Sequence, residues 1–383
     1  MRPRAVAAAC AALALWPATG GAQVFLRGHA EPLPGQVRSA SPAGVTVAEQ
    51  GGEPLTVSWD RVRHVAGPAA SSAAPLTPLA QAAFRARARV ERGDWRAAEP
   101  LLEELFAAHP RPGGPTGAVI AQGLLRCRLQ RGAQAASIVP WLAWLDVRRQ
   151  QAAAADKWEG GRLALPPIID PRTELVPALP PIWLPEPGLR AALDSPAWDQ
   201  FAQMDAVVAQ LAALYRHAAA AEAGAGEARR PLADPTDHPG VRLAWEVVAA
   251  RTGTDEQRRR ARVMLQQRMD SAPPAWVAAW CRAAIGRSLL QEPDPAQQRA
   301  GLLSLLSVPA AFAEGHPYLA GVCLAQAAVT ASALGDPGSA AALLREFDAS
   351  YGWHPAAQWP PLRELRAASA SAPHAPPAAS PNP

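Results

Sequence analysis

The sequence predicts a mainly α-helical protein built from antiparallel helical hairpins, with a small β module near its N-terminus. A short pattern occurs twice, as GDWRAAEPLLEELF from Gly93 to Phe106 and as GDPGSAAALLREFD from Gly335 to Asp348. Each copy follows an apolar, Ala-rich stretch, which is typical of a helix, a tight turn and a second helix. Residues 24–66, in contrast, are rich in Val, Thr and Gly, with apolar residues at alternate positions.

The first residues have the character of a secretory signal. Arg2 and Arg4 precede an apolar stretch from Ala5 to Trp16, and Gly20-Gly21-Ala22 supplies small residues for cleavage. We expect cleavage after Ala22, so that residues 1–22 are removed and the protein is periplasmic or secreted. The apolar stretch is too short to span a bilayer, and no other segment has 18 uninterrupted apolar residues, so we expect no transmembrane segment after cleavage.

Residues 23–66 predict an antiparallel meander of about four strands. The apolar residues that alternate with polar ones are Val45, Val47, Leu55, Val57 and Trp59. Gly51-Gly52 separates the two runs as a hairpin loop. The module resembles small SH3-like or Sm-like barrels. An intracellular barrel of this kind would suggest RNA, but an exported one is expected to pack on the helices or cap them.

The rest of the chain divides by composition. Residues 67–78, GPAASSAAPLTP, are expected to be a flexible linker. Two helical repeat blocks follow, at 79–151 and 196–367. Between them, residues 152–195 are rich in proline and also apolar, which predicts an ordered, extended strap against the helices. Residues 368–383 lack large apolar side chains and are expected to be a disordered tail.

The repeated pattern has a direct physical interpretation. Gly93 and Gly335 stand where a helix ends, because glycine adopts the left-handed conformation without a side-chain clash. Asp94 and Asp336 follow at once, and an aspartate there caps the next helix by accepting its free N–H groups. The aspartates are therefore expected to be helix caps and not catalytic acids.

These residues resemble the tetratricopeptide repeat. The positions that match the family are Gly93, Ala98, Leu102, Leu105 and Pro110 in the first copy, and Gly335, Ala340, Leu344 and Phe347 in the second. The resemblance implies an irregular solenoid of antiparallel helical hairpins with a concave binding face. A degraded third copy begins at Gly132. Pro100 departs from the pattern and is expected to kink the second helix or delay its start. The alternative is an irregular all-helical domain in which Gly-Asp turns recur.

Composition gives little indication of nucleic-acid binding. The formal net charge is +4, and removal of Arg2 and Arg4 with the signal lowers it to +2. The densest basic run, from Arg258 to Arg262, follows Asp255 and Glu256 and is interpreted as a solvated helix face. We expect no nucleic-acid partner.

Cysteines and tryptophans leave alternatives open. Cys127, Cys281 and Cys323 lie in apolar helical stretches, which favours buried free thiols, although Cys281 and Cys323 could form a disulfide in an exported protein. Several tryptophans have helical spacing, which favours packing between helices over an aromatic groove. They are Trp141, Trp144, Trp276 and Trp280.

The sequence contains no catalytic, cofactor-binding or metal-binding constellation. Ser288, in IGRSLL, comes nearest to a nucleophile-elbow pattern and lacks its second glycine. Histidines and acidic residues are scattered and do not have ligand spacing. We therefore expect no enzyme and no cofactor, but an exported scaffold or adaptor that binds a protein or peptide in the cell envelope. The alternative is an exported carbohydrate-binding protein or enzyme with a Trp-lined site.

Overall fold

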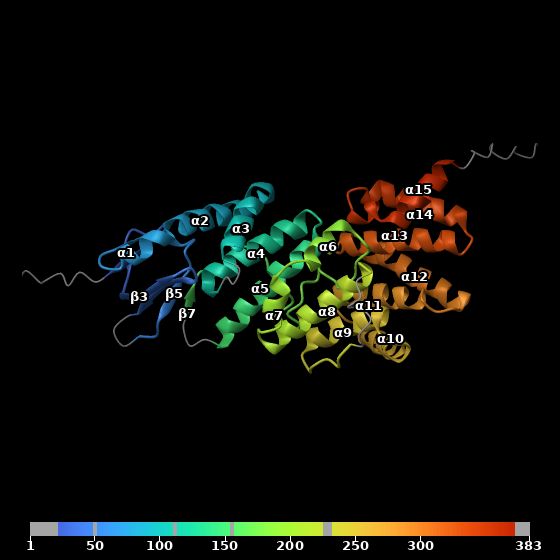
Figure 1. Cartoon of the computed structure of the whole chain (residues 1–383), viewed down its shortest axis with the longest axis horizontal. Helices are drawn as coiled ribbons and strands as arrows, with labels where there is room; N and C mark the ends of the chain where they lie inside the picture. The colour runs from blue at the N-terminus through green and yellow to red at the C-terminus, as the bar shows by residue number, and fades with distance from the viewer. Residues whose placement is uncertain (1–21, 49–51, 110–112, 154–156, 225–231, 372–383) are drawn as a thin grey trace, which may run out of the picture.

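The computed structural model describes residues 22–48, 52–109, 113–153, 157–224 and 232–371. The signal segment up to residue 21, Pro110 and the tail from residue 372 lie outside these ranges. The molecule is elongated, with the β strands at one end and the C-terminal helices at the other (Figure 1). It is mostly helical, and consecutive helices pack in pairs.

The β module forms two small sheets, with strand orders β2-β1-β6 and β3-β4-β5-β7. Its strands are β1 (Gln23–Leu26), β2 (Pro32–Leu33), β3 (Gln36–Ser41), β4 (Gly44–Ala48), β5 (Leu55–Val57), β6 (Val62–Ala66) and β7 (Lys157–Glu159). The alternating apolar residues point inward, and Val45, Val57 and Trp59 are buried. The indole N–H of Trp59 donates to the carbonyl of Ser41 at 2.6 Å.

Two expectations for this module need correction. Six strands, not about four, lie in the described part of residues 22–66. Strand β7 also joins the sheet from far along the chain, pairing in parallel with β5. Its three residues carry no local strand signal, so only the tertiary fold shows this pairing. The loop expected at Gly51-Gly52 falls partly outside the described residues.

The expected flexible linker at 67–78 is also wrong, because most of it is helical. It contains α1 (Ala70–Ala73), the short 3-10 helix η1 (Ala74–Leu76) and the start of α2 (Thr77–Glu91). Alanine is a strong helix former. Pro75 and Pro78 are the second residues of η1 and α2, where the missing N–H has no helical partner to lose.

The first helical block contains α2, α3 (Trp95–Ala108), α4 (Gly114–Gln130) and α5 (Gln134–Ala153). Helix α3 begins at Trp95, so Pro100 does not delay its start. Pro100 is on the exposed side of the helix, where water can satisfy the carbonyl that loses its N–H partner. Helix α5 also contains an internal proline, Pro140.

The second block contains a series of helices, of which α8 to α14 contact one another in chain order. They are α6 (Pro187–Leu193), α7 (Ala197–Phe201), α8 (Ala206–Glu222), α9 (Pro239–Thr252), α10 (Asp255–Asp270), α11 (Ala275–Leu289), α12 (Pro295–Phe312), α13 (Pro317–Ala333), α14 (Pro337–Tyr351), η3 (Pro355–Gln358) and α15 (Pro360–Ser371). Helix α15 therefore extends past residue 367 into the expected tail. None of the described helices has the length and apolar content needed to cross a bilayer.

Helices α9, α11 and α13 form an inner layer. Each is buried over most of its circumference, while α10, α12 and α14 keep an exposed face. Small residues make the close approach feasible, since a Cβ added at Gly286 would lie 2.9 Å from the Gly301 carbonyl oxygen. Helices α10, α12 and α14 therefore cover one side of the inner layer.

Residues 160–186 lie against the inner helices without forming helix or strand. Leu175, Leu179 and Trp183 from this strap are fully buried in the main hydrophobic cluster. Three aromatic donors from different helices bind strap carbonyls. They are Trp141 on α5 to Glu174 at 3.3 Å, Tyr215 on α8 to Leu179 at 2.6 Å and Trp280 on α11 to Pro177 at 3.1 Å. The strap thus occupies the inner face of the helices, and β7 and α6 lie at its two ends.

The glycine turns of the repeated pattern have left-handed backbones. Gly93, Gly132 and Gly335 have φ of 78°, 77° and 80°. Asp336 caps α14, because its carboxylate accepts the Ser339 N–H at 2.9 Å. Asp94 is the N-cap residue of α3 by position, but its side chain makes no capping bond. The Ala, Leu and Phe positions of both copies are buried between helices.

Replacing Gly335 with alanine should destabilise the protein by about 1 kcal/mol, because a Cβ is strained at positive φ. No atom lies within 4 Å of the added Cβ, so the cost is purely conformational. Urea unfolding measures it. Gly338→Ala in the first turn of α14 is the matched control and should be neutral or stabilising, since its φ is not in the left-handed region. Equal losses in both variants would contradict the explanation.

The three cysteines of the described chain are free and buried. Burial raises the pKa of Cys127, Cys281 and Cys323 to about 12 in each case. Thiols of this kind behave as small apolar side chains, and the disulfide left open for Cys281 and Cys323 is not formed.

Candidate binding groove

One face of α5 forms the floor of a groove. Ala136, Val139, Ala143, Asp146 and Gln150 follow one another at spacings of three and four, so they share a face. The alanines leave room above the helix. The opposite wall comes from α6, α7 and the loop before α8, and Phe106 at the end of α3 closes one side.

Two cavities lie along this face. The first has a volume of about 470 Å³ and the second about 650 Å³. They adjoin, because Phe106 and Val139 line both. We call the combined feature the α5 groove. Its floor runs from Ala135 to Ala153, or roughly 27 Å along the helix at 1.5 Å per residue.

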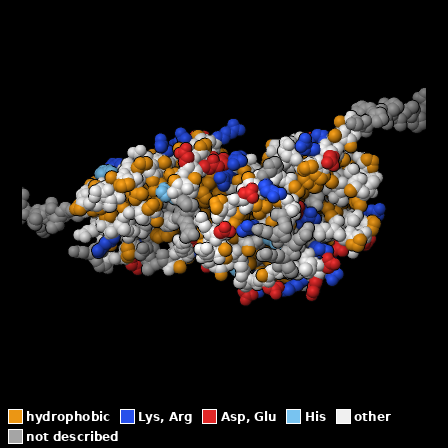
Figure 2. Space-filling view, viewed as in Figure 1, with side chains coloured by type: hydrophobic (Ala, Val, Ile, Leu, Met, Phe, Trp, Pro, Cys, Tyr) orange, Lys and Arg blue, Asp and Glu red, His pale blue; other side chains and the backbone are white. Residues whose placement is uncertain are grey.

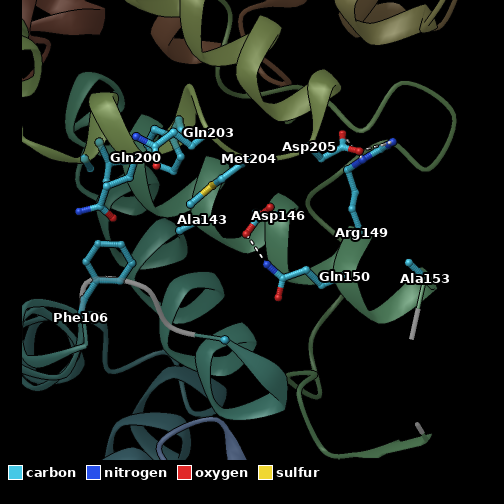
Figure 3. A pocket seen from close by; sticks show the side chains of 14 residues that line it. Phe106, Ala143, Asp146, Arg149, Gln150, Ala153, Gln200, Gln203, Met204 and Asp205 are labelled. Atoms are coloured by element: carbon cyan, nitrogen blue, oxygen red, sulfur yellow. Dashed lines mark hydrogen bonds and ion pairs between the residues drawn. The ribbon is translucent and has the colours of Figure 1, made fainter. Parts of the chain in front are cut away.

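The first cavity contains a buried acid. Asp146 is 8% exposed, and its Oδ2 accepts a hydrogen bond from the Gln150 amide at 2.6 Å. Figure 3 shows this bond and places Asp146 between Gln150 and Met204. Burial, and to a smaller degree the charge of Asp205, raise the pKa of Asp146, while the Gln150 bond opposes them.

The arginine that lines the same cavity, Arg149, is already engaged. Its Nη1 lies 2.6 Å from Glu174 of the strap, and its Nε lies 2.7 Å from Asp205. Burial favours the neutral form of Asp205, but the Val207 N–H and Arg149 hold its pKa below the usual value. Arg149 therefore fixes the strap and the start of α8 and leaves Asp146 without an ion pair among the described residues.

The second cavity repeats this arrangement with Glu186. Burial raises the pKa of Glu186 to about 7, and its side chain makes no capping bond to α6. Arg128 and Arg131 line the same cavity but face acids of α3. Arg128 lies 3.0 Å from Glu103, and Arg131 lies 2.9 Å from Glu99. Within the described ranges, Glu186 also lacks an ion pair.

The repeat-defining residues do not lie in this groove. Gly93, Ala98, Leu102 and Leu105 belong to the α2–α3 pair, and Gly335, Ala340, Leu344 and Phe347 to α13–α14, at separate places along the molecule (Figure 1). They build the hairpins. Asp146 and Glu186 are not among the site residues predicted from the sequence, although a single acid in the apolar run WLAWLDV is a usable signal for Asp146.

The tryptophans at helical spacing are mostly interior. Trp141 and Trp280 are fully buried, and Trp144 is 6% exposed. Trp276 packs edge-on against Trp280 with ring centroids 5.0 Å apart. It also lines, with Trp95, a separate cavity of about 470 Å³ under the strap.

Two other sequence features are accounted for by local contacts. Ser288 is buried and accepts a hydrogen bond from Arg262 at 2.9 Å. The basic run of α10 pairs with nearby acids, for example Arg262 with Glu292 at 2.7 Å. Figure 2 shows acidic and basic side chains intermingled on the visible face around α10. No cluster of potential metal ligands occurs among the described residues.

The protein is a mostly helical chain with a small β module at its N-terminal side. Its consecutive helices pack in pairs, which is compatible with a helical repeat. No protein-family model, curated protein or solved structure matches the chain. The functional assignment therefore depends on the geometry of the α5 groove.

Proposed function

We propose that this protein is a non-catalytic, exported binding protein that holds an extended segment of a protein partner in the α5 groove. The observation that carries the proposal is the pair of adjoining cavities along α5. At 3.3 Å per residue, a groove floor of roughly 27 Å accommodates about eight residues of extended chain. The signal-like residues 1–22 support export, and the glycine-turn hairpins support a tetratricopeptide-like solenoid.

The mixed lining of the groove suits a protein segment. Phe106, Val139 and Phe201 provide apolar contacts, while the amides of Gln150 and Gln200 can bond to main-chain groups of a ligand. Recognition of extended segments uses this combination, in which main-chain hydrogen bonds give affinity and side-chain pockets give selectivity. The strap already fills the inner face of the C-terminal helices, so the α5 groove is the open surface of the array that we assign to a partner.

A larger side chain that fills the groove should weaken the binding of peptides. Val139 is half-buried where the two cavities meet, and Val139→Trp should lower the affinity for bound peptides on the order of 100-fold by excluding the main chain. The measurement is binding of the purified full chain to an array of peptides from envelope proteins. Val263→Trp, on the exposed face of α10, is the matched control and should bind like the wild type.

A second candidate function depends on the cavity lined by Trp95 and Trp276, since indole rings commonly stack on sugars. A glycan array probed in parallel separates the two functions. Peptide binding that Val139→Trp removes supports the first. Glycan binding that Val139→Trp leaves intact, with no peptide bound, would replace it with the second.

A further inference from the structure

We propose that the α5 groove selects a segment with two basic side chains about five residues apart, one paired with Asp146 and the other with Glu186. The inference rests on the proposed function and specifies its ligand. It depends on two carboxylates that line the cavities without an ion pair among the described residues.

Asp146 has the geometry of a cation-binding acid. Among the described residues, a hydrogen bond is formed at Oδ2, with Gln150, and the other oxygen, Oδ1, is left for a ligand. The carboxylate is buried, and desolvation makes an unpaired charge there unfavourable. A guanidinium or ammonium group placed against Oδ1 would supply the missing countercharge and stabilise the ionised acid.

The cavity around Asp146 also fits the stem of a basic side chain. Phe201, Met204 and Ala143 give it an apolar lining. Long basic side chains bury their methylene stems along apolar surfaces and keep the charged end in polar surroundings. The ring of Phe106 lines the same cavity and can face a cation favourably.

Glu186 provides the second contact for a basic side chain, and its place in the second cavity gives the spacing between the two basic residues. It lines the second cavity together with Ala136 of α5. From Ala136 to Asp146 the helix rises about 15 Å, which an extended chain covers in about five residues. Arg128 and Arg131 are on the same cavity wall, but their ion pairs with Glu103 and Glu99 offset their charge. The unpaired charge of the groove is therefore negative.

A free polyamine carries the same cationic groups as a basic segment. The groove favours a polypeptide because its two cavities provide apolar walls and glutamine amides, and a polyamine has no carbonyl or side chain to use them. We therefore commit to a protein segment and use spermidine as the competing source.

The test compares two synthetic decapeptides of identical sequence, one with arginines at positions 3 and 8 and one with neutral citrulline there. Fluorescence anisotropy with the purified full chain at pH 8 should show the arginine peptide binding on the order of tenfold tighter or more. Asp146→Asn should remove most of this preference, and the double variant with Glu186→Gln should remove the rest. Asp199→Asn, on the exposed face of α7, should keep it.

The possible outcomes separate the two proposals. Equal affinity for the arginine and citrulline peptides, with Val139→Trp still blocking both, overturns the charge selection and leaves the groove function intact. Failure of both peptides to bind, together with the array peptides, overturns the proposed function itself. Spermidine that displaces the arginine peptide at equal concentration overturns the protein segment as the ligand. Circular dichroism of each variant confirms that the fold is retained.

Discussion

Replacing Glu186 with glutamine is expected to stabilise the free protein at pH 8 by up to about 3 kcal/mol. Burial raises the pKa of this carboxyl from 4.5 to about 7, so at pH 8 the folded protein holds a charge that the unfolded chain solvates better. Between pH 4.5 and 7 the unfolded state loses its proton first, and stability falls as pH rises. Below pH 4.5 both states are protonated and the penalty vanishes.

Urea unfolding of wild type and Glu186→Gln at pH 4 and pH 8 measures this difference. The charged groups around Glu186, namely Arg128 and Arg131 with their α3 partners, remain in both proteins, so their contributions cancel in the comparison. The pH 4 measurement serves as the internal control and should show little difference. Destabilisation at pH 8, or an equal effect at both pH values, would contradict the prediction.

The same substitution links stability to binding. A residue that costs folding energy in the free protein and lies in a groove is typical of functional sites, where ligand contacts offset the cost. Glu186→Gln should therefore produce a more stable protein that binds the arginine peptide less tightly at pH 8. A rise in stability together with a fall in affinity distinguishes a binding acid from a residue with a structural role.

Replacing Gly240 with alanine is expected to displace the strap and destabilise the protein by more than about 3 kcal/mol. An added Cβ would lie 1.9 Å from the carbonyl oxygen of Thr173 and 2.9 Å from its carbon. Both are backbone atoms, so no side-chain rotation relieves the overlap. The segment around Thr173 must move away from α9, and the contacts of Leu175 with the core weaken with it.

Limited proteolysis of the strap reports this movement directly. In wild type we expect residues 163–187 to resist cleavage, because their apolar side chains are buried and their carbonyls are bound by Trp141, Tyr215 and Trp280. Gly240→Ala should be cut there rapidly while far-UV circular dichroism shows that the helices persist. Gly315→Ala, whose Cβ would meet nothing within 4 Å, is the matched control. Rapid cleavage of the wild-type strap would show that it is not held against the helices.

The sequence predicts the helix ends and strands that depend on local chemistry. Left-handed glycines at 93 and 335 mark helix ends, and alternating valines at 45 and 47 mark a strand, because each signal acts over a few residues. The prediction of a flexible linker at residues 67–78 is wrong for the opposite reason. Its alanines and prolines suit a flexible chain, but they suit short helical turns as well, and packing against the β strands decides between them.

The groove could be predicted only in part. Periodicity places Asp146 on a face of α5 together with Val139 and Ala143, but it does not show whether that face is covered by another element. The cavities lie between this face and α6 and α7, which come from a later part of the chain. Glu186 in LPEPG falls within the predicted strap, and it shares its cavity with residues of α4 and α5 that lie far away in the sequence.

Strand β7 imposes an order on folding. Its partner β5 leaves the ribosome first, and the whole of α2 to α5 must follow before β7 is available to cover that edge. Closing so long a loop is slow, and an uncovered strand edge can pair with other chains in the meantime. A fragment that ends before Lys157 would leave the edge permanently open. The four-stranded sheet is thus completed late, by a strand that follows α5 in the chain.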